Sequence, residues 1–234
     1  MTYYESRARQ LLAEFDTTIE RVSDLFAARY GQADAAAIAG EARQVYERLI
    51  PDLPYVGGVQ PLTQFVIATG WFLAMYRALQ ARGRPVDEAG RLIYEVTEVY
   101  LQRYPGVARG LVGHLSFSKL YLARLRRRAQ ESQERPYPDG YVFRYMPGDG
   151  ATFDYGVDYL ECASCKFLAR QGAPELAPYL CTVDYIYSEM FGWGLVRTTT
   201  LAEGGDRCDF RFKRGGPTRI ASSVLRLPPK EVGV

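Results

Sequence analysis

The residue types best suited to chemistry lie in the last third of this 234-residue chain. All four cysteines fall there: Cys162, Cys165, Cys181 and Cys208. The same stretch contains Asp184, a carboxylate set among apolar and aromatic residues, where burial without a partner is costly. Two roles are open for Asp184: an ion pair with Arg197 or Lys166, or a general base whose pKa is tuned by its surroundings.

The cysteine spacing admits several chemistries. Cys162 and Cys165 form a CxxC pair, and all four cysteines together could bind zinc, although the later two do not form a second CxxC pair. A thioredoxin-type redox pair is disfavoured because the expected βαβ context is missing. Free cysteine is also a common small buried residue. We assign no metal ligand and keep the thiols as candidates for binding or catalysis.

Other common catalytic motifs are missing from the sequence. His114 is the only histidine, so a His-rich metal site is excluded, and its apolar neighbours favour a hydrogen-bonded core residue over a catalyst. The chain has no Walker-type loop, dinucleotide fingerprint, GxSxG elbow or HExxH.

The charge balance and the N-terminus argue against nucleic-acid-binding, secreted and membrane proteins. With 29 basic and 27 acidic residues, the net charge of +2 does not call for a nucleic-acid partner. The N-terminus is charged and does not resemble a secretory signal, and the longest uncharged run, 62–76, is shorter than the ~20 residues of a membrane span. We expect a cytoplasmic protein with reduced cysteines that acts on a small molecule, with no nucleic-acid or membrane partner; a homo-oligomer is left open.

Hydrophobic periodicity predicts the elements that must position these residues. Helical spacing predicts helices over residues 5–30, 33–49, 61–82, from 85 to the Pro105-Gly106 break, and 107–132. From Pro136 the period changes to two, which predicts strands near 141–145 and 153–159, a helix over 174–190, and a hairpin formed by 193–201 and 207–213, followed by an extended tail from Gly215.

The predicted fold class is α+β. A helical scaffold region (1–135) packs on a region that carries a small antiparallel sheet with a ββαββ order (136–234), and the two form one compact unit. The segment 61–82 is apolar almost all round, so we expect it to be the central buried helix, with Pro61 at its first position.

Within this frame, the predicted helix 174–190 aims the chemistry at the sheet. Cys181 and Asp184 are three residues apart and share one side of that helix. The stripe that should face the sheet consists of Leu180, Asp184, Tyr187 and Phe191. Cys208 alternates with Phe210 and Phe212 on the last predicted strand, so its side chain should meet Asp184 from the sheet.

Three runs of sequence resemble a known family. They are GWFLAMYRALQARGRPVDEAGRLIYEV, GAPELAPYLCTVDY and RTTTLAEGGDRCDFRF, and they are similar to L-2-amino-thiazoline-4-carboxylic acid hydrolase-type proteins over roughly residues 60–215. The most specific part is a CxxD followed at a distance by a CDF-containing strand. The same half also faintly resembles the 4-vinyl reductase-type small-molecule-binding domain.

The resemblance implies a hydrolase that opens a small cyclic amidine or thiazoline without an organic cofactor, releasing a thiol. It implies Asp184 as base or proton carrier, Cys181 as nucleophile or proton donor, and Cys208 facing them. We expect the substrate contacts to come from Arg197, Tyr185, Tyr187 and Cys165, with Arg197 on the substrate carboxylate. The rival interpretation is a non-catalytic small-molecule or metal-binding module that uses the same pocket.

Overall fold

The protein has the α+β architecture that the sequence predicts, in a computed structural model that describes residues 2–58 and 62–225. The helices of the N-terminal half are α1 (Ala8–Arg21), α2 (Ser23–Tyr30), α3 (Gln32–Leu49), α4 (Leu62–Gln80), α5 (Val86–Gln102), α6 (Gly106–Leu115) and α7 (Lys119–Gln133). The C-terminal half contains α8 (Ala163–Arg170), α9 (Ala177–Leu180) and α10 (Val183–Phe191). Its strands are β1 (Val142–Pro147), β2 (Tyr155–Glu161), β3 (Leu195–Arg197), β4 (Cys208–Phe212) and β5 (Arg219–Ile220).

The strands form a sheet of order β1-β2-β4-β3-β5. The first four are antiparallel to their neighbours, but β5 is parallel to β3, so the prediction of a wholly antiparallel sheet is wrong. The reason lies in the turn after β4: the chain reverses there, and β5 therefore runs opposite to β4, as β3 does. The tail from 215 accordingly contains a strand, and its last nine residues, 226–234, lie outside the described residues.

Three predicted helices are broken in the structure. The segment 5–30 breaks at Val22, whose ψ of 10° departs from the helical value. The segment 107–132 breaks before Ser118, whose side chain caps α7 by accepting the Tyr121 N–H at 3.2 Å. The segment 174–190 breaks at Cys181–Thr182, where the Thr182 hydroxyl donates to the Tyr179 carbonyl at 2.7 Å. Serine and threonine side chains compete with the helical backbone in this way.

The prediction for the β-region omitted one helix and made one strand too long. Helix α8 directly follows β2, so the ββαββ order is too simple. Strand β3 ends at Arg197 because the next two N–H groups, of Thr198 and Thr199, donate to the Asp209 carboxylate at 2.7 and 2.8 Å. The carboxylate of Asp209 thus takes the place of the backbone carbonyl groups that a neighbouring strand would offer to these N–H groups.

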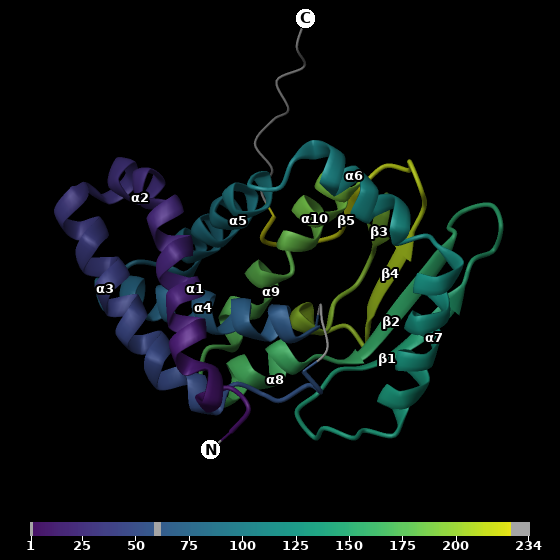
Figure 1. The fold of residues 1–234 in the computed structure, drawn as a ribbon, viewed down its shortest axis with the longest axis horizontal. Helices are drawn as coiled ribbons and strands as arrows, with labels where there is room; N and C mark the ends of the chain where they lie inside the picture. Colours follow the sequence, from purple (N-terminus) through teal and green to yellow (C-terminus); the bar gives the residue numbers. More distant parts are fainter. Residues whose placement is uncertain (1, 59–61, 226–234) are drawn as a thin grey trace, which may run out of the picture.

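Helix α4 is the central buried helix, as predicted. Thirteen of its 19 residues are buried, which fits its nearly all-round apolar surface. Pro61, its predicted first residue, lies outside the described residues. Figure 1 shows α1–α4 at one side, the sheet and α7 at the other, and α9 and α10 between them. None of the described helices is long and apolar enough to cross a membrane.

One hydrophobic core joins the two predicted regions. Buried residues of α1–α5, such as Phe15 and Leu73, belong to the same cluster as Phe167 and Leu168 of α8 and Val183 of α10. A second cluster packs Ala129 of α7 on the sheet. Because apolar burial is the main stabilising term, this shared core should couple the unfolding of the two regions.

We predict that residues 1–135 and 136–234 unfold in one transition. The two tryptophans report on different places, since Trp71 lies in the first core and Trp193 packs against the second. A Trp71→Phe variant leaves Trp193 as the single tryptophan, and a Trp193→Phe variant leaves Trp71. In each variant, the midpoint of urea unfolding measured by fluorescence should match the midpoint measured by far-UV circular dichroism. Midpoints that separate in either variant would show that the regions unfold independently.

Helix α6 touches the rest of the protein through a glycine. Gly113 is its one buried residue, and a Cβ at this position would lie 1.9 Å from the carbonyl oxygen of Phe191, at the end of α10. Gly110, on the same helix, has nothing within 4 Å of its Cβ position. The two glycines therefore form a matched pair.

Gly113→Ala should lower the free energy of unfolding by about 1–3 kcal/mol, because backbone must move to admit the methyl group. Gly110→Ala should raise it by about 0.5–1 kcal/mol, through the better helix propensity of alanine. Urea unfolding of both variants checks this, and equal effects would mean that α6 is not seated on α10.

Candidate active site

A cavity of about 260 Å³ lies between the helices and one face of the sheet. Its walls are largely aliphatic and aromatic, with contributions from α4, α5, α7, α10 and the strands. The polar and thiol side chains that line it include Thr69, Tyr141, Tyr159, Cys162, Ser164, Cys181, Asp184, Arg197 and Cys208. An apolar enclosure with a few polar groups is the usual form of a small-molecule site.

Strand register brings the sheet residues to one face. Tyr159 pairs with Cys208, and Val157 pairs with Phe210, so these four side chains point to the same side. All four line the cavity. The predicted alternation of Cys208 with Phe210 and Phe212 therefore describes the wall correctly.

Asp184 and Arg197 form a buried ion pair at this wall. The Arg197 Nη1 group donates to Asp184 Oδ2 and, at 3.0 Å, to the carbonyl oxygen of Cys181. Arg197 is 1% exposed, and its guanidinium also lies over the Phe210 ring, 5.6 Å from the centroid. Lys166, the other partner considered for Asp184, pairs instead with Glu161.

The Arg197 guanidinium still has hydrogen-bonding capacity. Its Nε and Nη2 atoms are buried and have no acceptor among the described residues. Buried N–H groups without a partner are costly. Arg197 lines the cavity, but its side chain is 0% exposed, so a carboxylate or another anion would pair with these two groups only after a small shift of the cavity wall uncovers them.

The pKa of Asp184 is raised to about 6, chiefly because burial penalises the carboxylate, while Arg197 acts in the opposite direction. The side chain keeps a 20% exposed fraction, and since Asp184 lines the cavity, that surface is available to a bound molecule. A carboxyl group that titrates near pH 6 can accept and return a proton at neutral pH.

Two of the thiols remain protonated in this environment. Burial is the largest cause that raises the pKa of Cys181, and the negative charge of Asp184 adds to it. Burial also raises the pKa of Cys208 to about 12, although its sulfur accepts the Leu201 N–H at 3.2 Å. Thiols of this kind can donate weak hydrogen bonds but are poor nucleophiles.

Cys162 differs from the other cysteines. The Cys165 thiol and the N–H groups of Cys165 and Ser164 lower its pKa, against the effects of burial and of Asp184. It immediately precedes α8, the position at which helix N–H groups favour a negative charge. Sequence reasoning selected Cys165 for the site and missed Cys162; the strand-to-helix junction was the signal.

These residues influence one another electrostatically. Asp184 contributes to the pKa shifts of Cys162, Cys181 and Cys208, and Arg197 acts on Asp184, Cys181 and Cys208. We call the five residues the Asp184 cluster. They come from α10, β3, β4 and two helix boundaries, so only the folded chain assembles them.

Residues 64–212 match the family described as L-2-amino-thiazoline-4-carboxylic acid hydrolase, which is 149 of the 234 residues. The chain belongs to this family. No curated protein and no solved structure shows a significant match. The segment shared with the L-2-amino-thiazoline-4-carboxylic acid hydrolase family contains the whole Asp184 cluster.

Two residues predicted to bind substrate in this hydrolase-family protein lie away from the cavity wall. Tyr187 lines the cavity and stacks on Phe191 and Trp193. Tyr185 and Cys165 are not among the lining residues, and Tyr185 acts electrostatically on Tyr94 of α5 instead.

The structure of this hydrolase-family protein also tests the predictions made for His114 and for a zinc site. His114 is exposed on α6, so the prediction of a core histidine is wrong. In the part of the chain that the structure describes, no group of three or more His, Cys, Asp or Glu side chains has the arrangement of a metal site. The four-thiolate zinc hypothesis therefore has no geometry here to support it.

Proposed function

We propose that the protein hydrolyses a small cyclic amidine of the 2-amino-thiazoline-4-carboxylate type. The observation that carries the proposal is the buried Asp184–Arg197 pair in an apolar cavity, with two Arg197 N–H donors left free. It combines a proton carrier with an anchor for a carboxylate. Membership of a family with this hydrolase name supports the same substrate class.

In the proposed reaction, the substrate carboxylate accepts from Arg197 Nε and Nη2, and the aromatic walls enclose the ring. Asp184 takes a proton from water as the oxygen attacks the amidine carbon, and it passes that proton to the ring nitrogen. It then takes the hydroxyl proton and delivers it to the ring sulfur as the carbon–sulfur bond breaks. One water is consumed, and the single ring-opened product carries both a urea group and a free thiol.

The thiols of Cys181 and Cys208 have a secondary part in this proposal. Because their pKa values are raised, they act as neutral neighbours of the reacting groups and not as nucleophiles. Even when raised to about 6, the pKa of Asp184 stays below the pKa of either thiol, so its carboxyl group is the stronger acid and the better proton donor to the leaving sulfur.

Ring opening is tested with the purified protein and 2-amino-thiazoline-4-carboxylate, by mass spectrometry of the carbamoylated cysteine product and by thiol release above the protein's own thiols. The expected result is turnover by the native chain. A saturable binding signal without ring opening would replace the enzyme with a non-catalytic small-molecule module. Absence of both binding and turnover would exclude this substrate class.

A further inference from the structure

Two thiols have no part in the proposed hydrolysis. Cys162 lies between the end of β2 and the start of α8, and Cys165 is the third residue of α8. Both are free thiols. Cys162 lines the cavity, whereas Cys165 is not among the lining residues, and the two thiols influence each other electrostatically.

The two sulfurs have opposite electrostatic surroundings. The Cys165 thiol and the neighbouring backbone N–H groups of Cys165 and Ser164 lower the pKa of Cys162, although its side chain forms no capping hydrogen bond with α8. For Cys165, the neighbouring Cys162 thiol and burial both raise the pKa. A dithiol exchange site needs this asymmetry. One thiol attacks from the cavity wall, and its neighbour stays protonated until it acts as the resolving thiol.

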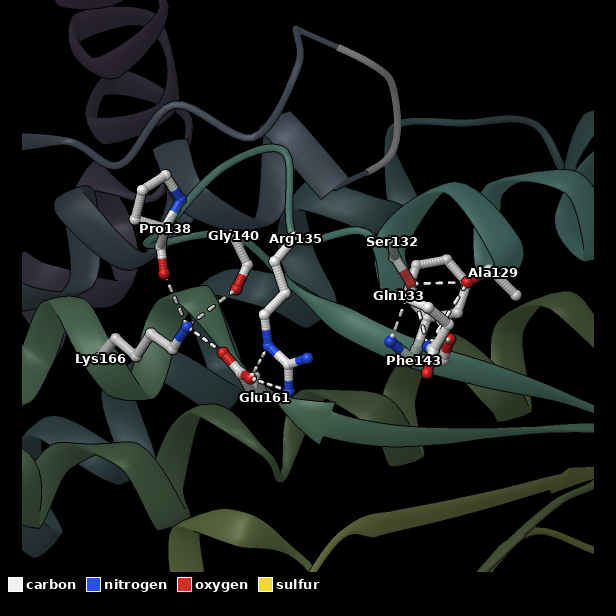
Figure 2. A network of polar contacts seen from close by, with 9 residues as sticks. All are labelled: Ala129, Ser132, Gln133, Arg135, Pro138, Gly140, Phe143, Glu161 and Lys166. Atoms are coloured by element: carbon white, nitrogen blue, oxygen red, sulfur yellow. Dashed lines mark hydrogen bonds and ion pairs between the residues drawn. The ribbon is translucent and has the colours of Figure 1, made fainter.

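The residues on either side of the CxxC motif are fixed from outside (Figure 2). Glu161 forms ion pairs with Lys166 and with Arg135, whose Nη2 lies 2.9 Å from Oε1. Lys166 also donates to the carbonyl oxygen of Pro138 at 2.9 Å. Glu161 and Lys166 immediately flank the motif, so both of its ends are tied to the same network.

The motif is also held from the cavity side. The Ser164 hydroxyl, between the two cysteines, lies 2.8 Å from Thr69 Oγ1 and 3.0 Å from the Tyr141 hydroxyl. With both sides of the segment fixed, Cys162 and Cys165 keep their positions at the start of α8, and residues three apart at a helix start are close enough for a disulfide after small rotations.

We propose that Cys162 and Cys165 form a thiol–disulfide exchange site for small disulfides that carry carboxylates. The cavity gives access to Cys162, and the free N–H donors of Arg197 on the same cavity favour a carboxylate-bearing partner. The site works without hydrolysis, so the proposal stands apart from the proposed function.

The exchange balances with the small disulfide as oxidant. The Cys162 thiolate attacks one sulfur of the small disulfide, whose S–S bond breaks, and the other half leaves as a thiolate that takes up a proton. Cys165 then loses its proton and attacks the Cys162 sulfur, which releases the first half as a second thiol. The cysteine pair loses two electrons and two protons, and the small disulfide gains them.

Trypsin separates the relevant cysteines, which makes the test direct. Cys162 and Cys165 share one peptide, 145–166, while Cys181 falls in 171–197 and Cys208 in 208–211. The full chain is incubated with cystine, alkylated with iodoacetamide and digested. The 145–166 peptide should lose two hydrogens and resist alkylation, while the other two peptides stay reduced as internal controls. A 145–166 peptide that remains fully alkylated, or earlier oxidation of Cys181 or Cys208, would overturn the proposal.

Two variants and a second probe assign the roles. Cys165→Ser should accumulate a mixed disulfide at Cys162, since no resolving thiol remains, and Cys162→Ser should form neither product. Cystamine is cystine without its carboxylates, and it should react roughly tenfold more slowly if Arg197 guides the partner. An unmodified Cys165→Ser variant would refute the attacking role of Cys162, and equal rates for the two probes would refute the carboxylate preference.

Discussion

Replacing Asp184 by asparagine should lower kcat/KM for ring opening by about 10²- to 10⁴-fold, the usual contribution of a positioned acid–base group. Asparagine keeps the shape and can still accept a hydrogen bond from Arg197, so the fold should persist. Kinetics on the proposed substrate, together with circular dichroism, measure both properties. Tyr185→Phe is the matched control, because Tyr185 is the next residue of α10 and does not line the cavity.

The role of Asp184 as a base also predicts the direction in which kcat/KM changes with pH. Asp184 acts first as a base, so its ionised form is the active one, and its pKa of about 6 should appear as a loss of kcat/KM when pH falls through 6. Above that pH the carboxylate is present and the rate should reach a plateau. An Asp184→Asn variant with near-native turnover, or a native profile that rises on acidification, would remove Asp184 from the reaction.

Arg197→Lys should act on substrate recognition. Lysine keeps a positive charge near Asp184 but cannot supply the Nε and Nη2 donors of the planar guanidinium. Hydrogen bonds to charged groups contribute about 1.5–3 kcal/mol, so KM for 2-amino-thiazoline-4-carboxylate should rise roughly ten- to hundredfold.

A substrate without the carboxylate separates recognition from chemistry in this variant. The native protein should prefer 2-amino-thiazoline-4-carboxylate over 2-amino-thiazoline, and Arg197→Lys should lose most of that preference while its kcat/KM on the smaller ring changes little. The ratio of the two kcat/KM values is the measurement. A ratio that the substitution leaves unchanged would mean that the carboxylate binds elsewhere.

Much of the fold was predictable because its two halves follow different periods. Every described strand follows the change at Pro136, as predicted, and the all-round apolar surface of α4 correctly predicts its burial. The breaks at Ser118 and Thr182 were not predicted, since a single hydroxyl decides between capping and continuing a helix. Strand β5 has two residues, too few for a periodic signal.

The candidate site was predictable where one periodic element carries it. Helical spacing puts Asp184 and Tyr187 on the cavity side of α10, and strand alternation puts Cys208 on the cavity wall. Tyr185 is off that stripe and lies elsewhere. The distinction between Cys162 and Cys165 depends on where α8 begins, which sequence periodicity locates poorly.

Strand β3 carries Arg197, and its outer neighbour is β5, which comes after the end of the family match at residue 212. The Ala221 N–H donates to the Arg197 carbonyl at 2.8 Å, and Thr218 hydrogen-bonds to Ser188 at 2.7 Å. A chain shortened to the family segment would retain every residue of the Asp184 cluster but turn β3 into an open edge strand, a template for aggregation. We therefore expect the smallest stable unit of this protein to be longer than the segment by which its family is recognised.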